Sequence, residues 1–201
     1  MRSANPHVLP LAGGLLGLAL FAQPGLSQDA SACWIQPGQG TKADAAARPS
    51  PLDSASVRID GAEMKVCYGA PSARGRQIMG ALVPYDLPWR AGADEATTLR
   101  LSFPAQVAGV RLEPGAYSLY VVPRAEGWRV VLNATVERWG VPIATAVTET
   151  DIGAGTAGVE STEQPVERLR YRFDAVDGAN VDLLLEWERT RVRIPIRRLD
   201  L

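Results

Sequence analysis

The stretch VDLLLEWERTRVRIPI, residues 181–196, decides the fold class. Apolar and polar residues alternate along it, which is the pattern of half-buried β-strands. A tight turn at Arg189–Thr190 would pair its two halves so that apolar residues meet on one face and opposite charges meet on the other. The charge pairs predicted by this register are Glu188 with Arg191, Glu186 with Arg193 and Asp182 with Arg197.

A second alternating segment lies just upstream, at residues 168–173. Arginines occupy positions 168, 170 and 172, and Leu169, Tyr171 and Phe173 lie between them. We therefore expect an acidic strand between two arginine-rich strands. Because three acidic residues stand opposite the arginines, we interpret them as a solvated charge ladder that sets the register, and not as a site for a polyanion.

The rest of the chain also has the pattern of short strands separated by turns. Alternation or apolar runs predict strands at residues 57–59, 64–68, 98–103, 110–112, 116–122 and 128–133, with a hairpin turn at Asp60–Gly61. We predict an all-β fold, an antiparallel β-sandwich of roughly eight or nine strands. Two long loops interrupt it, at residues 69–97 and 134–165, and the second contains Trp139–Gly140 and a flexible acidic tract.

The N-terminus has the order of a secretory signal peptide: an early charge, an apolar run at residues 8–22 and then small residues. That run of 15 residues is shorter than the about 20 that a membrane span needs. We predict a signal peptide at residues 1–27, with cleavage as late as residue 32, and an exported protein, periplasmic or secreted. Lipid attachment at Cys33 is a less favoured alternative, because Ala30 stands where a lipoprotein signal usually has Leu.

Composition then divides the remaining chain into two parts. Residues 36–53 are rich in Gly, Pro, Ala, Lys and Ser, so we predict a flexible N-terminal tether without regular structure at residues 28–52. Residues 53–201 are long enough for a single domain with its own core.

Loss of the leader removes much of the chemistry open to the chain. His7 is the only histidine, so catalysis by a Ser-His-Asp or Cys-His arrangement and histidine metal sites are excluded from the rest. Loss of Arg2 leaves 20 basic and 22 acidic residues, and no basic patch indicates a nucleic-acid partner. The spacing of Asp86, Asp94 and Glu95 matches no calcium loop, so we predict no metal and no cofactor.

Two cysteines remain, Cys33 and Cys67, in a chain predicted to enter an oxidising compartment. We favour a disulfide between them over a buried free Cys67. The bond would close a loop of about 34 residues, which chain-entropy reasoning credits with roughly 3 to 4 kcal/mol of stability.

The loop at residues 69–97 is the candidate ligand site, because long connections on a sandwich carry charged and aromatic residues to the surface. Arginines suit carboxylate or phosphate groups, and aromatic rings offer stacking surfaces. The alternative is a structural brace in which Arg74 or Arg76 clamps Glu95 while Trp89 belongs to the core. The candidate ligand-binding residues are Tyr68, Arg74, Arg76, Tyr85, Trp89, Arg90, Asp94 and Glu95.

Several motifs in this order resemble the bacterial domain-of-unknown-function 2911 family. They are YGAPSARGR, LVPYDLPWRAGADEATT, LEPGAYSLYVVP, WRVVLN, the Trp139–Gly140 pair and LLLEWERTRVRIPI, spread over residues 51–196. The resemblance implies an exported bacterial β-sandwich and implies no reaction. This chain departs from the family pattern at Ala70, where Arg is frequent, at Asp94, where Asn is usual, and at residues 141–143, where some relatives have a polar or His-containing segment.

Two classes of function stay open. The first is a non-catalytic binding or interaction module of the cell envelope, whose partner is an envelope ligand or protein. The second is a hydrolase-like enzyme that uses Asp94 or Glu95. The sandwich scaffold, the lack of histidine and the lack of a nucleophile motif favour the first.

Overall fold

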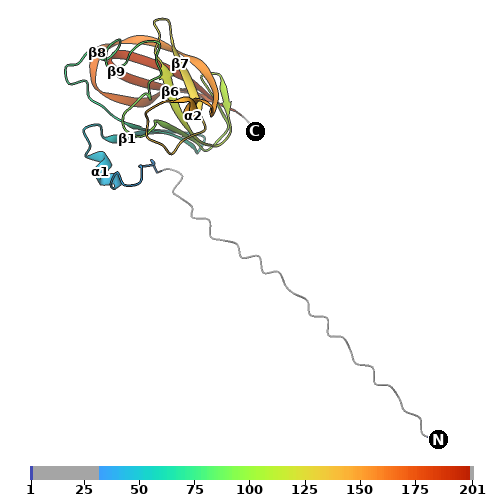
Figure 1. Cartoon of the computed structure of the whole chain (residues 1–201). Helices are drawn as coiled ribbons and strands as arrows, with labels where there is room; N and C mark the ends of the chain where they lie inside the picture. The colour runs from blue at the N-terminus through green and yellow to red at the C-terminus, as the bar shows by residue number, and fades with distance from the viewer. Residues whose placement is uncertain (2–31, 200–201) are drawn as a thin grey trace.

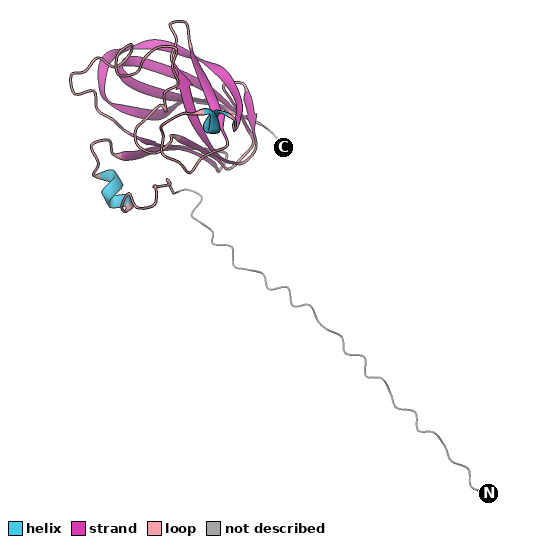
Figure 2. Cartoon of the chain, in the orientation of Figure 1, coloured by secondary structure: helices cyan, strands magenta, loops and turns pink. Residues whose placement is uncertain are grey.

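The computed structural model describes Met1 and residues 32–199. The rest of the predicted signal peptide lies outside the described residues. Strands make up most of the folded part and two short helices lie at its surface (Figure 2). Among the described residues, no helix is both long enough and apolar enough to cross a membrane.

The strands run antiparallel throughout. Their bounds are β1 (Leu52–Ile59), β2 (Ala62–Gly69), β3 (Thr98–Leu101), β4 (Ala105–Val107), β5 (Val110–Leu112), β6 (Gly115–Val122), β7 (Trp128–Asn133), β8 (Asp151–Asp177) and β9 (Asn180–Arg198). The helices are α1 (Lys42–Ala46) and α2 (Thr145–Thr148).

The two layers of the fold share one strand. The order of pairing is β1-β2-β3-β6-β7-β8-β9-β4-β5. Residues 151–157 of β8 pair with β7, and residues 158–177 pair with β9. Strand β8 therefore leaves one layer and enters the other, and the layers face each other as a β-sandwich (Figure 1). The predicted fold class is confirmed.

Alternate residues of the strands fill the space between the layers, as the sequence pattern predicts. The largest fully buried side chains include Trp128, Trp187, Leu99, Leu185 and Ile194. The predicted hairpin at Asp60–Gly61 is also present. Both residues have positive φ, 48° and 80°, as a type I′ turn requires, and Ile59 pairs with Ala62.

The predicted turn at Arg189–Thr190 is wrong, because residues 180–198 form one continuous strand, β9. The buried side of the strand changes from odd to even residue numbers near Glu188, and Glu188 has a φ of 54°. An irregularity within one strand changes which alternate residues face the core, and a turn between two strands has the same effect on the sequence pattern. In place of the predicted hairpin, β9 pairs with β8, in which Val159 lies opposite Val192 and Tyr171 lies opposite Leu185, and its end pairs with β4.

The charge ladder exists, but its partners differ from the predicted pairs. The fully buried carboxylate of Glu186 is bonded to Arg170 and Arg172 on β8 and to Arg191 on β9, while Asp182 pairs with Arg193 at 2.6 Å. Burial alone would raise the pKa of Glu186, but the arginine hydrogen bonds outweigh burial and lower it. The acidic part of β9 lies beside the arginine-rich part of β8, as predicted, but the second predicted arginine-rich strand is the continuation of β9 itself.

The predicted loop at residues 134–165 ends at residue 150, because the supposed flexible tract is the first part of β8. The glycines in this segment interrupt the alternation of apolar and polar residues on which strand prediction relies. At Gly155 a Cβ atom would lie 1.6 Å from the carbonyl oxygen of Ala108, so the close approach of the β4–β5 turn requires glycine there.

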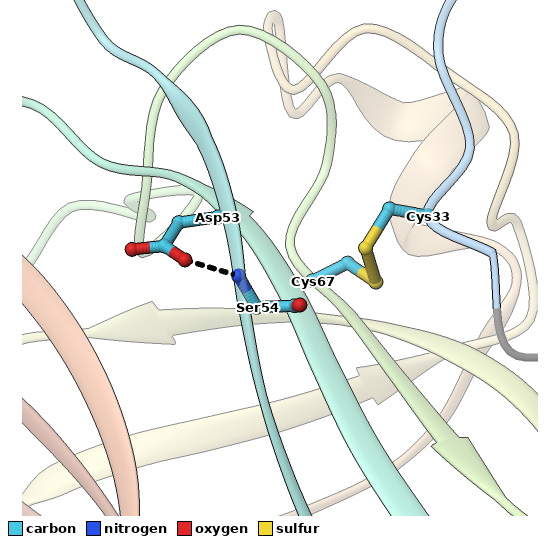
Figure 3. The surroundings of a disulfide bond; sticks show 4 residues. All are labelled: Cys33, Asp53, Ser54 and Cys67. Carbon is cyan, nitrogen blue, oxygen red and sulfur yellow. Dashed lines mark hydrogen bonds between the residues drawn. A yellow bond between two sulfur atoms is a disulfide. The ribbon is translucent and has the colours of Figure 1, made fainter. Parts of the chain in front are cut away.

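The segment predicted to lack regular structure contains α1 and the start of β1, and residues 33–49 contact β2 and the connection between β2 and β3. We call residues 33–49 the N-terminal strap. Its helix begins with a capping box between Thr41 and Asp44, and Ala45 is fully buried. Cys33 of the strap is bonded to Cys67 of β2, with an S–S distance of 2.06 Å (Figure 3). The predicted disulfide is therefore present, and such a bond is compatible with an exported protein.

Loss of this disulfide is expected to destabilise the domain. Reduction, or Cys33→Ser, should lower the free energy of unfolding by up to about 3 to 4 kcal/mol, because the unfolded chain regains the freedom of the closed loop. Denaturant unfolding with and without reductant measures the change. Two reactive thiols in the unreduced, denatured protein would contradict the bond.

Loss of the Glu186 carboxylate is expected to cost about 1 to 3 kcal/mol at pH 7, because hydrogen bonds to charged groups are lost inside the sheet. At pH values above 4.5, the usual pKa of the group, the lowered pKa of Glu186 stabilises the folded state. This stabilisation is lost as the pH falls through the pKa that Glu186 has in the folded state. The difference between wild type and Glu186→Gln, measured by denaturant unfolding, should therefore shrink at low pH. As a control, Glu63→Gln breaks the exposed pair with Arg58 and should cost less than about 1 kcal/mol.

Candidate functional site

The long loop, residues 70–97, connects β2 to β3 and is attached to the sandwich at three points. Backbone bridges join Ser72 to Arg168, Trp89 to Val121 and Glu95 to Trp139. The loop therefore contacts β8, β6 and the connection between β7 and β8. These pairings set the course of the loop. Loops of this length without regular structure are uncommon in compact domains and are usually functional or disordered.

The loop contains several residues other than glycine in the left-handed region. Asp86, Ala91 and Asp94 have φ values of 60°, 55° and 59°. Such residues cost of order 1–3 kcal/mol each and persist where surrounding contacts hold them. At Ala91 these contacts are two hydrogen bonds that its carbonyl accepts, from Thr97 Oγ1 at 3.1 Å and from Tyr171 Oη at 2.9 Å.

Glu95 lies beneath the N-terminal strap and is only 3% exposed. Its Oε2 accepts a hydrogen bond from Arg48 Nη1 at 2.7 Å, and its Oε1 accepts one from the backbone N–H of Gln36 at 3.2 Å. Both donors belong to the strap. A clamp on Glu95 was predicted, but its arginine is Arg48, not Arg74 or Arg76.

The two predicted clamp arginines bond elsewhere. The backbone N–H of Arg74 donates to Glu167 Oε1 at 2.8 Å, and its guanidinium donates to the carbonyl of Pro49. The guanidinium of Arg76 donates to the carbonyls of Ala73 and Ser72, within its own turn. Both side chains are exposed and each braces the backbone around it.

Asp94 and Arg90 lie next to this clamp, half-buried. Asp94 Oδ2 is 3.9 Å from Arg48 Nη1, and burial raises the pKa of Asp94 despite the opposing effect of the nearby arginines. Burial also lowers the pKa of Arg90, whose Nε donates to the carbonyl of Gly92. The N–H of Gly140 donates to the carbonyl of Asp94 at 2.7 Å.

Gly140 explains the Trp139–Gly140 pair. A Cβ atom at this position would lie 2.4 Å from Arg90 Cδ and 2.9 Å from the carbonyl oxygen of Asp94. Only glycine lets the β7–β8 connection approach the long loop this closely. The pair thus holds the β7–β8 connection against the part of the long loop that contains Arg90 and Asp94.

Two of the aromatic candidates belong mainly to the core. Trp89 stacks on Trp187 with ring centroids 5.9 Å apart and meets Trp128 edge to face at 6.1 Å. Tyr68 packs against Tyr171 at 4.7 Å, and burial raises the pKa of Tyr68 to about 12. These rings support the loop from beneath.

Tyr85 is the aromatic candidate that faces solvent, at 49% exposed. Leu82 and Leu87, which sequence reasoning missed, are 47% and 56% exposed beside it in the sequence. We call Leu82, Tyr85 and Leu87 the 82–87 patch. The signal in the sequence was an apolar run interrupted by Pro84 and Pro88, since prolines prevent the strand pairing that would bury such a run.

A polar cluster on β6, β7 and β8 was also missed. Tyr120 Oη donates to Asp151 Oδ2 at 2.6 Å, and Asn133 Nδ2 donates to Asp151 Oδ1 at 2.8 Å. Burial and the contact with Asp151 raise the pKa of Tyr120. Nearby, Arg138 Nε and Nη2 are buried without a hydrogen-bond partner among the described residues. The signal was the polar pair Tyr120 and Asn133 at buried positions of two otherwise largely apolar strands.

The described residues contain no group of three or more His, Cys, Asp or Glu side chains that could hold a metal ion. The structure thus brings Asp94, Glu95 and Arg90 together with Arg48. It leaves Arg74, Arg76 and Tyr85 at the surface and places Tyr68 and Trp89 in or against the core.

The adjacent carboxylates are expected to respond to mutation in opposite directions. Asp94→Asn should raise the melting temperature at pH 7, because the raised pKa means that burial disfavours the charged form, and Asn tolerates a left-handed backbone. This gain should disappear below pH 3.8, the usual pKa of the group, where Asp94 is protonated in both states. Glu95→Gln should cost roughly 1.5–3 kcal/mol, since it removes the charged partner of Arg48.

Thermal unfolding of both variants from pH 3 to pH 8 measures the two effects. Equal destabilisation by both changes at pH 7 would contradict the different roles assigned to the two carboxylates.

Comparison with known proteins identifies a family but no activity. Residues 50–196 match the model of the family described as "Protein of unknown function (DUF2911)". No curated protein and no solved structure matches the chain. The matched stretch begins just before β1, ends inside β9 and makes up most of the sequence. The chain therefore belongs to the DUF2911 family.

Proposed function

We propose that this protein is a non-catalytic binding or interaction module of the cell envelope, and that the 82–87 patch is its contact surface for another protein. The observation that carries the proposal is the exposure of three large apolar side chains within six residues of one loop. Exposed apolar patches on a folded domain mark interaction sites, and three such side chains within one short segment are the candidate for one here.

The chemistry of the patch favours a protein partner. Leu82 and Leu87 offer no hydrogen-bonding group, and Tyr85 offers one at the tip of an apolar ring. A glycan or nucleotide site needs several convergent polar groups, whereas an apolar protein surface needs few. Full burial of a leucine side chain contributes about 1.5–3 kcal/mol, so burial of the exposed half of each of these side chains would contribute about 1 kcal/mol.

The loop beneath the patch is already ordered, which reduces the entropy lost on binding. The N–H of Asp86 donates to the carbonyl of Pro123 at 2.9 Å, and the N–H of Trp89 donates to the carbonyl of Val121 at 2.7 Å. Asp86 also pairs with Arg124 at 3.6 Å, and both side chains are exposed. Charges at the rim of an apolar patch orient a partner more than they add affinity.

The alternative, a hydrolase that uses Asp94 or Glu95, is less well supported by the geometry. Both carboxylate oxygens of Glu95 accept hydrogen bonds from the strap, and the side chain is almost completely covered. Asp94 shares the same arginine. We therefore place the function on the surface of the loop.

Site-specific photo-crosslinking tests the proposal. Benzoylphenylalanine in place of Tyr85, in cells that express the full chain, should give a discrete adduct with another protein after irradiation. Leu82→Ser together with Leu87→Ser should abolish the adduct without unfolding the domain, as checked by circular dichroism. The matched control is the same photo-probe in place of Val176, which is 54% exposed on another element, β8, and should give no such adduct.

An absent adduct at Tyr85, or the same adduct from Val176, would contradict the proposed surface. An adduct with twice the mass of the chain would identify the partner as a second copy.

A further inference from the structure

The N-terminal strap lies on the domain in the manner of a bound peptide. It is joined covalently through Cys33–Cys67, it makes charged contacts through Arg48, and it buries Ala45. The domain also reaches back to it, since Arg74 Nη2 donates to the carbonyl of Pro49 at 3.2 Å. In Figure 1, α1 of the strap lies outside the sandwich, beside β1.

The strap lies outside the part of the chain that matches the family. The match begins at residue 50, whereas Glu95 and Asp94 lie well within it. Arg48 and Gln36, which donate to the Glu95 carboxylate, both precede the match. A carboxylate at this depth needs a charged or hydrogen-bonding partner, and in this chain the strap supplies it.

We propose that the surface around Asp94 and Glu95 is a binding site for an arginine-bearing peptide segment, and that Arg48 of the strap occupies it in cis. The guanidinium meets the geometry of the site. Its Nη1 lies 2.7 Å from Glu95 Oε2 and 3.9 Å from Asp94 Oδ2. Its Nη2 donates to the carbonyl of Gln39 within the strap at 3.0 Å, which holds the guanidinium in this orientation. A lysine ammonium lacks the flat fork of donors that contacts Glu95 while it also bonds to the strap.

Arg48 occupies the site from within the same chain, which limits the binding of a second segment. Because Arg48 lies just before β1 and Cys33–Cys67 ties the other end of the strap to β2, Arg48 is present at a high effective concentration, and a free peptide competes poorly. Removal of the Arg48 guanidinium leaves the carboxylates without their charged partner. This surface is separate from the 82–87 patch, so crosslinking at Tyr85 does not depend on it.

The test measures binding of the strap's own sequence in trans. The probe is a fluorescent peptide of residues 41–51, TKADAAARPSP, and the control peptide carries Arg48→Gln. Fluorescence anisotropy should show that the full chain with Arg48→Ala binds the arginine peptide at least tenfold more tightly than the wild type. The chain with both Arg48→Ala and Glu95→Gln should not bind it, and the control peptide should bind none of the proteins.

A matched protein control is Arg111→Ala, which removes an exposed arginine of β5 that pairs with Glu113, outside both proposed surfaces. It should behave as the wild type does. Equal binding of the arginine peptide by wild type and Arg48→Ala, or equal binding of both peptides, would overturn the proposal.

If Arg48→Ala does not fold alone, circular dichroism melts are recorded with each peptide. Rescue of folding by the arginine peptide, but not by the control peptide, supports the proposal. Failure of both peptides would show that Arg48 is a brace required for folding and would overturn it.

Discussion

The pairing of β8 with β9 is the constraint on which the rest of the structure depends. These are the two longest strands, and β8 pairs first with β7 and then with β9. One strand therefore joins both layers of the sandwich, and the register of β8 against β9 decides which side chains enter the core. Apolar pairs such as Tyr171 with Leu185 and the arginine contacts of Glu186 require the same register. A shift by one residue would bury charges and expose the core.

The long loop depends on this framework for its shape. Trp89 stacks on Trp187 of β9, Tyr171 of β8 holds the carbonyl of Ala91, and Glu188 of β9 accepts hydrogen bonds from the backbone of Ile78 and Met79. The core strands thus determine where the loop turns. Those turns bring Leu82, Tyr85 and Leu87 to solvent and turn Glu95 toward the strap.

The N-terminal strap changes how the acidic residues of the loop are interpreted. Two adjacent carboxylates on a loop are residue types that catalytic and metal-binding sites commonly contain. Here one of them is sealed by Arg48, and the same arginine lies near the other. The contact joins residues 47 positions apart in the sequence. Its partner arginine lies in a stretch whose Gly, Pro and Ala content is typical of a linker, so composition alone gives no sign of it.

The fold class, most of the strands and the Asp60–Gly61 hairpin follow from the sequence, and the disulfide is the favoured state of the two cysteines outside the predicted signal peptide. Period-two alternation and turn dipeptides depend on residues close together in the chain, and a cysteine count needs no knowledge of the fold. Local signals failed at Glu188, where an irregularity in a strand resembles a turn, and at Gly155, where close packing resembles a loop. The tertiary structure alone decided which arginine pairs with Glu95, which arginines surround Glu186 and which apolar residues of the long loop remain exposed. These pairings and exposures depend on contacts between residues far apart in the sequence. The packing of the whole sandwich determines which of those contacts form.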